Sequence, residues 1–250
     1  MTRCTPENVH FVCQDLDHPE GLNFAADGSL IAGGEAGQIY RIDCSSGKSE
    51  TIAETGGTVL GVCTDGAGAV CACDAGRNEV LKTDAGGEVS VLSTGALDNP
   101  NYCAFDAAGN LFFTESVKYH PQERTGRLFV ITPDGKTECV HDGPFGFANG
   151  ICIDPETSLL YLVESTGPRV LVFQTDGPKL ARPDRRHPAR WAFRGALPRL
   201  HVRMAEPADE HRPPREQDLL WQYRRMAYRH DRARADAVGC NPTLASILVT

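Results

Sequence analysis

"EGLNFAADGSLIAGG", residues 20–34, has the pattern of a short β-strand, a turn at Asp27 and Gly28, and a second strand. The same pattern occurs three more times in the chain. The later copies are LGVCTDGAGAVCACD at 60–74, NYCAFDAAGNLFFTES at 101–116 and NGICIDPETSLLYLVES at 149–165. Each copy leads into one more strand and turn. The chain therefore contains an internal repeat, and this repeat decides the fold class.

The spacing of the copies indicates their architecture. They begin at Glu20, Leu60, Asn101 and Asn149, at intervals of 40, 41 and 48 residues. About four short strands in every 40–50 residues, joined by glycine-containing turns, are typical of a β-propeller. An irregular β-sandwich also produces evenly spaced short strands and is the alternative. Because the copies resemble one another in sequence as well as in spacing, we predict an all-β propeller with about four recognisable blades.

The residues that begin the copies also suggest a site. In a propeller the innermost strands line the central channel, so equivalent positions of different blades converge at one rim. Three of the four positions, Glu20, Asn101 and Asn149, carry side-chain oxygens. One carboxylate and two amides form a hard-oxygen site suited to Ca²⁺, Mg²⁺ or Mn²⁺, with Zn²⁺ as a further candidate. The competing interpretation is that Glu-Gly and Asn-Gly pairs are ordinary turn sequences.

Three motifs resemble the senescence-marker-protein/gluconolactonase family, which includes regucalcin. They are HPEGLNF at 18–24, NPNYCAFDAAGNLFFTES at 99–116 and FANGICIDPETSLLYLVES at 147–165. The resemblance covers roughly residues 8–178. It implies a six-bladed propeller with one divalent metal ion on its axis, and a small-molecule sugar lactone as substrate. By this resemblance Glu20 and Asn149 are metal ligands, and Asn101 is a catalytic residue that contacts the substrate or the metal-bound water.

The sequence also departs from the family pattern. Tyr102 stands where members commonly have an aspartate, and Asn99 where some have a substrate-binding arginine, so substrate preference does not carry over. The third metal ligand of the family is an aspartate in a Pro-Asp-Gly motif, which should follow soon after residue 190. No such motif occurs there, and Asp184 in RPDRR lacks the glycine. We therefore expect this chain to be a poor lactonase.

Composition changes abruptly near Pro178. Residues 1–178 contain 10 Lys and Arg against 25 Asp and Glu, a net charge of −15, whereas residues 179–250 contain 15 against 8, a net charge of +7. The sequence predicts propeller blades over 1–178 and an anomalous Arg/Pro-rich segment over 179–250. A reading frame shifted near Pro178 is one hypothesis for this segment. A basic appendage and a diverged docking segment are the alternatives, and nucleic-acid binding is disfavoured because prolines and carboxylates interrupt the arginines.

The hydrophobic pattern and the cysteines indicate the cellular compartment that we expect for the protein. No run of about 18 apolar residues occurs, so no membrane span is expected. The N-terminus lacks the apolar region of a signal peptide, which favours the cytoplasm. The ten cysteines are then expected to be reduced, with Cys63, Cys103 and Cys152 packed as small hydrophobic residues. Glu115 and Glu164, at the ends of equivalent strands, are expected to be solvated.

Together these observations predict a metal-dependent hydrolase that resembles the sugar lactone lactonases and has impaired activity. Two alternatives stay open. One is a non-catalytic propeller that binds a metal ion or a partner protein. The other is an enzyme like strictosidine synthase, whose fold is similar. The sequence does not indicate the lactone, the metal ion or the oligomeric state.

Overall fold

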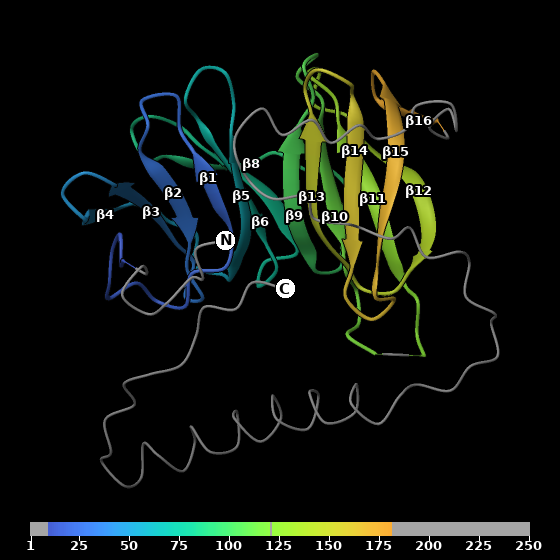
Figure 1. Cartoon of the computed structure of the whole chain (residues 1–250), viewed down its shortest axis with the longest axis horizontal. Coiled ribbons are helices and arrows are strands. Elements are labelled where there is room, and N and C mark those ends of the chain that lie inside the picture. The colour runs from blue at the N-terminus through green and yellow to red at the C-terminus, as the bar shows by residue number, and fades with distance from the viewer. Residues whose placement is uncertain (1–9, 121, 182–250) are drawn as a thin grey trace, which may run out of the picture. The chain divides into compact units, whose positions relative to one another are not determined.

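The computed structural model describes residues 10–120 and 122–181, which form four four-stranded sheets (Figure 1). Blade 1 comprises β1 (Leu22–Phe24), β2 (Leu30–Gly33), β3 (Gln38–Asp43) and β4 (Lys48–Glu54). Blade 2 comprises β5 (Val59–Thr64), β6 (Val70–Asp74), β7 (Glu79–Thr83) and β8 (Val89–Val91). Blade 3 comprises β9 (Pro100–Phe105), β10 (Leu111–Glu115), β11 (Gly126–Ile131) and β12 (Thr137–Phe145). Blade 4 comprises β13 (Ala148–Asp154), β14 (Leu159–Glu164), β15 (Arg169–Asp176) and β16 (Lys179–Ala181).

In every sheet the strands pair in chain order and run antiparallel. The first strands of the four sheets contact one another in sequence, β1 with β5, β5 with β9, and β9 with β13. A sandwich would place strands from distant parts of the chain in two shared sheets, whereas here each sequence copy forms a sheet of its own. The predicted all-β propeller with four recognisable blades is therefore confirmed.

The Asp/Gly turns create the repeat. Gly28, Gly68 and Gly109 have φ angles of 85°, 87° and 85°, in the left-handed region that glycine adopts at little cost. In blades 2 and 3 the preceding aspartate accepts backbone N–H bonds within its own turn. Asp65 accepts from residues 67 and 69, and Asp106 from residues 108 and 110, all at 2.8–2.9 Å. The side chain and the glycine together fix the same hairpin in successive blades.

A cluster of buried apolar side chains lies between each pair of neighbouring blades. The alternating pattern of strand β10 shows how a blade serves two clusters, because Phe112 packs toward blade 4 and Phe113 toward blade 2. Both side chains are fully buried. Burial of an aromatic side chain of this size stabilises the fold by roughly 1.5–3 kcal/mol.

The outward faces of the first and last described blades differ from this pattern. Leu22 and Phe24 lie in strand β1, but they are 52% and 67% exposed. Cys152 of β13 is also exposed. These side chains point away from the neighbouring blade, and no further described blade covers them. The prediction that Cys152 would be packed was therefore wrong, because alternation places half of each inner strand on a face whose partner is not among the described residues.

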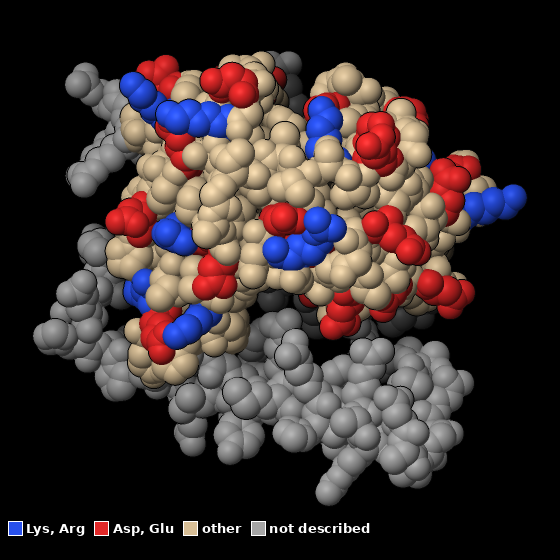
Figure 2. All heavy atoms as spheres, turned by 180° about the vertical axis from the view of Figure 1, so that it is seen from behind, with Lys and Arg blue, Asp and Glu red and all other residues tan. Residues whose placement is uncertain are grey.

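The fourth blade continues past Pro178, since Lys179–Ala181 form its last strand and pair with β15. The rest of the predicted C-terminal segment, residues 182–250 with Asp184, lies outside the described residues. No helix within the described part of the chain is long and apolar enough to cross a membrane. Acidic and basic side chains lie interspersed over the face seen in Figure 2.

Candidate axial site

The first residues of the four sequence copies lie near the starts of the four inner strands, Glu20 just before β1 and the other three within β5, β9 and β13. We call Glu20, Leu60, Asn101 and Asn149 the axial positions. A β-carbon on Gly21 would lie 2.4 Å from the Leu60 carbonyl oxygen, and one on Gly61 would lie 2.6 Å from the Asn101 carbonyl oxygen. In the next pair of blades, Thr114 Oγ1 donates a hydrogen bond of 2.7 Å to the Asn149 carbonyl oxygen. Each blade therefore meets the next one at or beside an axial position.

Three blades reach the axial position through the same strained backbone. The residue two places before it has a positive φ in blade 1 (His18, 41°), blade 3 (Asn99, 62°) and blade 4 (Phe147, 55°). This left-handed conformation is uncommon for residues other than glycine, and such strain clusters at functional sites. Thr58, the equivalent residue of blade 2, has no positive φ. The three strained blades are those whose axial residue carries a side-chain oxygen.

The three oxygen-bearing side chains have different surroundings. Glu20 is exposed, and its carboxylate makes no hydrogen bond or ion pair with another described residue. Asn101 is 6% exposed, and its amide likewise has no hydrogen-bond partner among the described side chains and backbone. Asn149 is half-buried, and its Nδ2 donates to Ser165 Oγ at 2.8 Å. The bond to Ser165 engages the nitrogen of Asn149 and leaves its amide oxygen for another partner.

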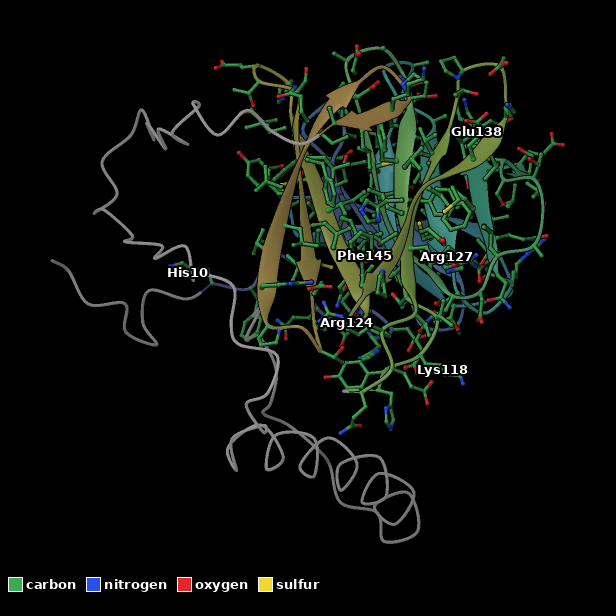
Figure 3. All side chains as sticks on the ribbon, turned by 90° about the vertical axis from the view of Figure 1, so that its right-hand side faces the viewer. His10, Lys118, Arg124, Arg127, Glu138 and Phe145 are labelled. Atoms are coloured by element: carbon green, nitrogen blue, oxygen red, sulfur yellow. The ribbon has the colours of Figure 1, made fainter. Side chains whose placement is uncertain are left out.

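A buried carboxylate holds the segment that leads into the axial position of blade 3. Glu115, the last residue of β10, is fully buried, and its Oε1 accepts the Asp98 N–H at 2.6 Å. Its other oxygen is paired with Arg127 at the start of β11, where Figure 3 shows the arginine. Asp98 stands three residues before Asn101, next to left-handed Asn99. Glu115 is thus a structural anchor rather than the solvated residue that we expected.

Glu164 repeats this arrangement in blade 4. Its Oε1 accepts the Gly146 N–H at 2.8 Å, again three residues before the axial position, and its two oxygens bind Arg124 and Arg169. Burial acts to raise the pKa of Glu164, but the hydrogen bonds from Arg169 and Gly146 and the charges of both arginines outweigh it. The pKa of Glu164 therefore lies below its ordinary value. The expectation that Glu164 is solvated was also wrong.

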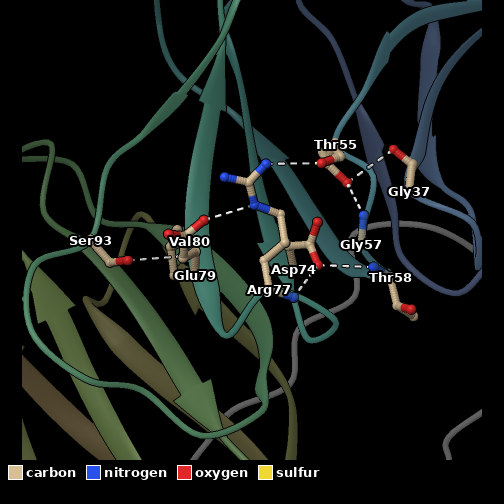
Figure 4. Close-up of polar contacts among 9 residues, drawn as sticks. All are labelled: Gly37, Thr55, Gly57, Thr58, Asp74, Arg77, Glu79, Val80 and Ser93. Atoms are coloured by element: carbon tan, nitrogen blue, oxygen red, sulfur yellow. Dashed lines mark hydrogen bonds and ion pairs between the residues drawn. The ribbon is translucent and has the colours of Figure 1, made fainter.

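Blade 2 has a weaker version of the same anchor, shown in Figure 4. Asp74 ends β6, is fully buried, and accepts the backbone N–H groups of Thr58 and Arg77 through Oδ1, both at 2.9 Å. The Arg77 guanidinium does not reach this carboxylate, because it pairs with Glu79 and donates to the Thr55 carbonyl. Asp74 Oδ2 is buried and has no hydrogen-bond partner among the described residues.

Tyr102, the residue after axial Asn101, links several inner strands. Its hydroxyl donates to the Leu22 carbonyl of blade 1 at 3.3 Å. On the way its ring passes Gly61 of blade 2, where a β-carbon would lie 3.0 Å from Tyr102 Cδ2. Burial raises the pKa of this hydroxyl. The sequence identified Tyr102 as a departure from the family pattern, but it contained no signal for a contact that spans 80 residues.

The chemistry of the axial side chains fits a hard divalent cation, since one carboxylate and two amide oxygens are the ligands that such ions prefer. The fit rests on two observations, the unpaired Glu20 carboxylate and the amide oxygen of Asn149 that its bond to Ser165 leaves free. Over residues 10–120 and 122–181, no group of three or more His, Cys, Asp and Glu side chains could hold a metal ion. A site here would thus depend on the amides.

Comparison with known proteins places the chain in a family. The model of the SMP-30/Gluconolactonase/LRE-like region matches residues 35–193, a range that contains Asn101 and Asn149 but begins after Glu20. No curated protein sequence matches the chain.

Solved structures share the fold at low identity. A gluconolactonase from Xanthomonas campestris, described as important in glucose secondary metabolic pathways, matches with a TM-score of 0.59 and 18% identity. The match covers 68% of this chain and 62% of that one. A structure with a provisional gluconolactonase assignment gives 0.58 and 16%, covering 69% and 66%. A nidogen/laminin complex gives 0.54 and 20%, covering 66% of each chain.

The chain thus spans less than two thirds of the length of the first of these structures. Since a nidogen/laminin complex shares the fold with gluconolactonases, the fold alone does not decide the chemistry. The family match covers more than half of the sequence and rests on the blades themselves. The chain belongs to the SMP-30/gluconolactonase/LRE-like family.

Proposed function

We propose that the chain is a metal-dependent hydrolase of sugar lactones that works slowly, with Glu20, Asn101 and Asn149 as its functional residues. The observation that carries the proposal is the shared backbone of blades 1, 3 and 4. In each, a left-handed residue precedes the oxygen-bearing axial residue by two places, and blade 2 lacks both features. Membership of the gluconolactonase family supplies the substrate class.

Each axial residue has a role that follows from its surroundings. Glu20 and Asn149 would hold the cation, Glu20 through its unpaired carboxylate and Asn149 through the amide oxygen that its bond to Ser165 leaves free. A bound divalent cation supplies a Lewis acid that polarises the lactone carbonyl. Asn101 would orient the substrate or the attacking water through its amide, which has no other described partner.

Two features support slow turnover. The sequence lacks the Pro-Asp-Gly aspartate that is the family's third metal ligand and that would also serve as the general base. Loss of a general base typically costs about 10²–10⁴-fold in rate. In addition, the family commonly has an aspartate at the position of Tyr102, and here the larger tyrosine ring lies beside Gly61. Both features also favour the second candidate function, a propeller that binds a metal ion without catalysis.

The test is hydrolysis of glucono-δ-lactone by the full chain. The rate is measured from the acid that is released at constant pH, and the rate of spontaneous hydrolysis is subtracted. We expect weak turnover that chelator removes and a divalent cation restores. Glu20→Gln should weaken metal binding more than Asn101→Ala does, because it removes a charge from the site. Glu50→Gln, with the same change on exposed strand β4, is the matched control.

Metal binding measured by calorimetry separates the two candidates. Binding that depends on Glu20, without turnover above background, would identify a non-catalytic metal-binding propeller. Chelator-insensitive turnover, or turnover unchanged in Glu20→Gln and Asn101→Ala, would contradict the proposed site.

A further inference from the structure

The cluster between blades 2 and 3 has an unusual composition. Four of its nine buried residues are cysteines, namely Cys63, Cys71, Cys73 and Cys103, and each is at most 4% exposed. The other two interblade clusters contain no buried cysteine. Packing alone does not require sulfur at four neighbouring places, since Ile31 and Val62 fill the positions equivalent to Cys71 and Cys103 between blades 1 and 2.

Two of these thiols face each other across the blade boundary. Cys63 lies in β5 and Cys103 in β9, and their sulfur atoms are 3.4 Å apart. A disulfide needs a sulfur separation near 2.05 Å. The two inner strands already touch next to the pair, because a β-carbon on Gly61 would lie 2.6 Å from Tyr102 Cα. Closure therefore requires a small movement of side chains between strands that are in contact.

We propose that Cys63 and Cys103 form a modification site, an interblade disulfide that a peroxide generates and a dithiol reverses. The Cys103 thiolate attacks one oxygen of hydrogen peroxide, the O–O bond breaks, and the displaced hydroxide takes a proton to become water. Cys63 then attacks the sulfur of the resulting sulfenic acid, the S–S bond forms, and its proton leaves with hydroxide as a second water. Two thiols thus lose two electrons and two protons, and the peroxide becomes two waters.

The surrounding thiols select Cys103 as the attacking group. Hydrogen bonds from Cys63 and Cys73 lower the pKa of the Cys103 thiol. The hydrogen bonds of Cys63 with Cys103 and Cys71, together with burial, raise the pKa of Cys63. The cluster thus stabilises one thiolate among thiols, and the thiolate is the reactive form.

The link would join positions 40 residues apart in sequence and tie two inner strands together. Asn101 stands two residues before Cys103, so the strand that carries this axial residue would be fixed to blade 2. Closing a loop of this length restricts the unfolded chain, and we expect the melting temperature to rise by about 5–10 °C. The proposal does not depend on lactone hydrolysis.

The experiment uses the full chain. Native alkylation first blocks accessible thiols, which include the exposed Cys44, Cys139 and Cys152. Hydrogen peroxide is then added, and the protein is unfolded with a second alkylating agent and digested. Cleavage at lysine and arginine gives peptide 49–77 with Cys63, Cys71 and Cys73, and peptide 83–118 with Cys103 alone. We expect these two peptides to be joined, with a mass about 2 Da below their sum.

Cleavage before Asp65 identifies the partner in the wild-type protein, because it separates Cys63 from Cys71 and Cys73. The proposal requires Cys103 to remain joined to the fragment that contains Cys63. Cys63→Ala should abolish both the link and the rise in melting temperature, whereas Cys71→Ala and Cys73→Ala should retain them. Absence of the joined peptide after peroxide treatment, or a link from Cys103 to Cys71 or Cys73, overturns the proposal.

Discussion

Asp74 in blade 2 and Glu164 in blade 4 occupy the same place, at the end of the second strand, and both are buried. Each accepts a backbone N–H from the segment that leads into its inner strand. Glu164 is neutralised by two arginines, whereas no guanidinium reaches Asp74, and one of its oxygens has no described hydrogen-bond partner. Blade 4 also carries a left-handed residue and an axial asparagine, and blade 2 carries neither. Between these two blades the stronger anchor accompanies the strained backbone and the candidate ligand, whereas in blade 1 Gly34 stands at the anchor position.

The largest expected effect comes from removing the arginine of an anchor. Arg127→Ala would leave Glu115 buried with the Asp98 N–H as its described partner, and breaking such a pair costs up to about 3–5 kcal/mol. Because Arg127 is itself 36% exposed, we expect a loss of about 2–3 kcal/mol in the free energy of unfolding after allowing for screening. Arg77→Ala in blade 2 is the control and should cost less than about 1 kcal/mol. Equal losses in urea titrations would remove the distinction between the blades.

The next effect is acid sensitivity caused by Glu164. Its pKa is lower in the folded state than in the unfolded state, so the unfolded chain binds protons first as pH falls. The stability that this group contributes is complete above its ordinary pKa of about 4.5 and is lost as pH falls through the folded value. Glu164→Gln should therefore lower stability by roughly 2 kcal/mol at pH 7 and flatten the decline below pH 5.

Asp74→Asn provides the matched measurement, since it keeps the acceptor oxygen and removes no arginine pair. Denaturation midpoints between pH 3 and pH 7 measure both variants. If Glu164→Gln leaves the acid-side slope as steep as in the wild type, the arginine pairs do not control it.

A smaller effect is expected where the inner strands of blades 2 and 3 touch. Gly61→Ala would place a β-carbon 2.6 Å from the Asn101 carbonyl oxygen and from Tyr102 Cα, so backbone must move. We expect a cost of about 1–2 kcal/mol and slower lactone turnover, because Asn101, which would orient the substrate or the attacking water, shifts. Gly66→Ala, with open space around its β-carbon, should be neutral or slightly stabilising in thermal melts. A neutral Gly61→Ala would show that the strands separate freely.

The smallest effect tests the strained backbone directly. Glycine at His18 removes the side-chain penalty of the left-handed conformation, whereas glycine at Thr58 adds only flexibility. We expect His18→Gly to be neutral or stabilising by less than about 1 kcal/mol, and Thr58→Gly to be destabilising by a similar amount. Changes of the same sign in both variants would mean that the two backbones do not differ in strain in solution.

The blades could be predicted from the sequence because each Asp/Gly turn depends on a few adjacent residues, and the turn recurs at Gly28, Gly68 and Gly109. The anchors have no such signal. Glu164 meets Arg124 across 40 residues of sequence, and Glu115 meets Arg127 in the next strand, so each glutamate looks like any strand-end carboxylate. The left-handed backbone of Phe147 has no sequence signal either, because phenylalanine does not favour that conformation, and a single histidine such as His18 is too weak a signal to predict it. The roles of Glu20, Asn101 and Asn149 stay a prediction.

The contacts at Gly21 and Gly61 have a consequence for how the protein can diversify. Where inner strands meet main chain to main chain, the bore of the channel depends on the thickness of the polypeptide backbone rather than on the volume of side chains. Substitutions elsewhere in the blades would then leave the width of the channel unchanged. New substrates would have to be acquired by exchanging side chains at or beside the axial positions, where Tyr102 already departs from the family pattern.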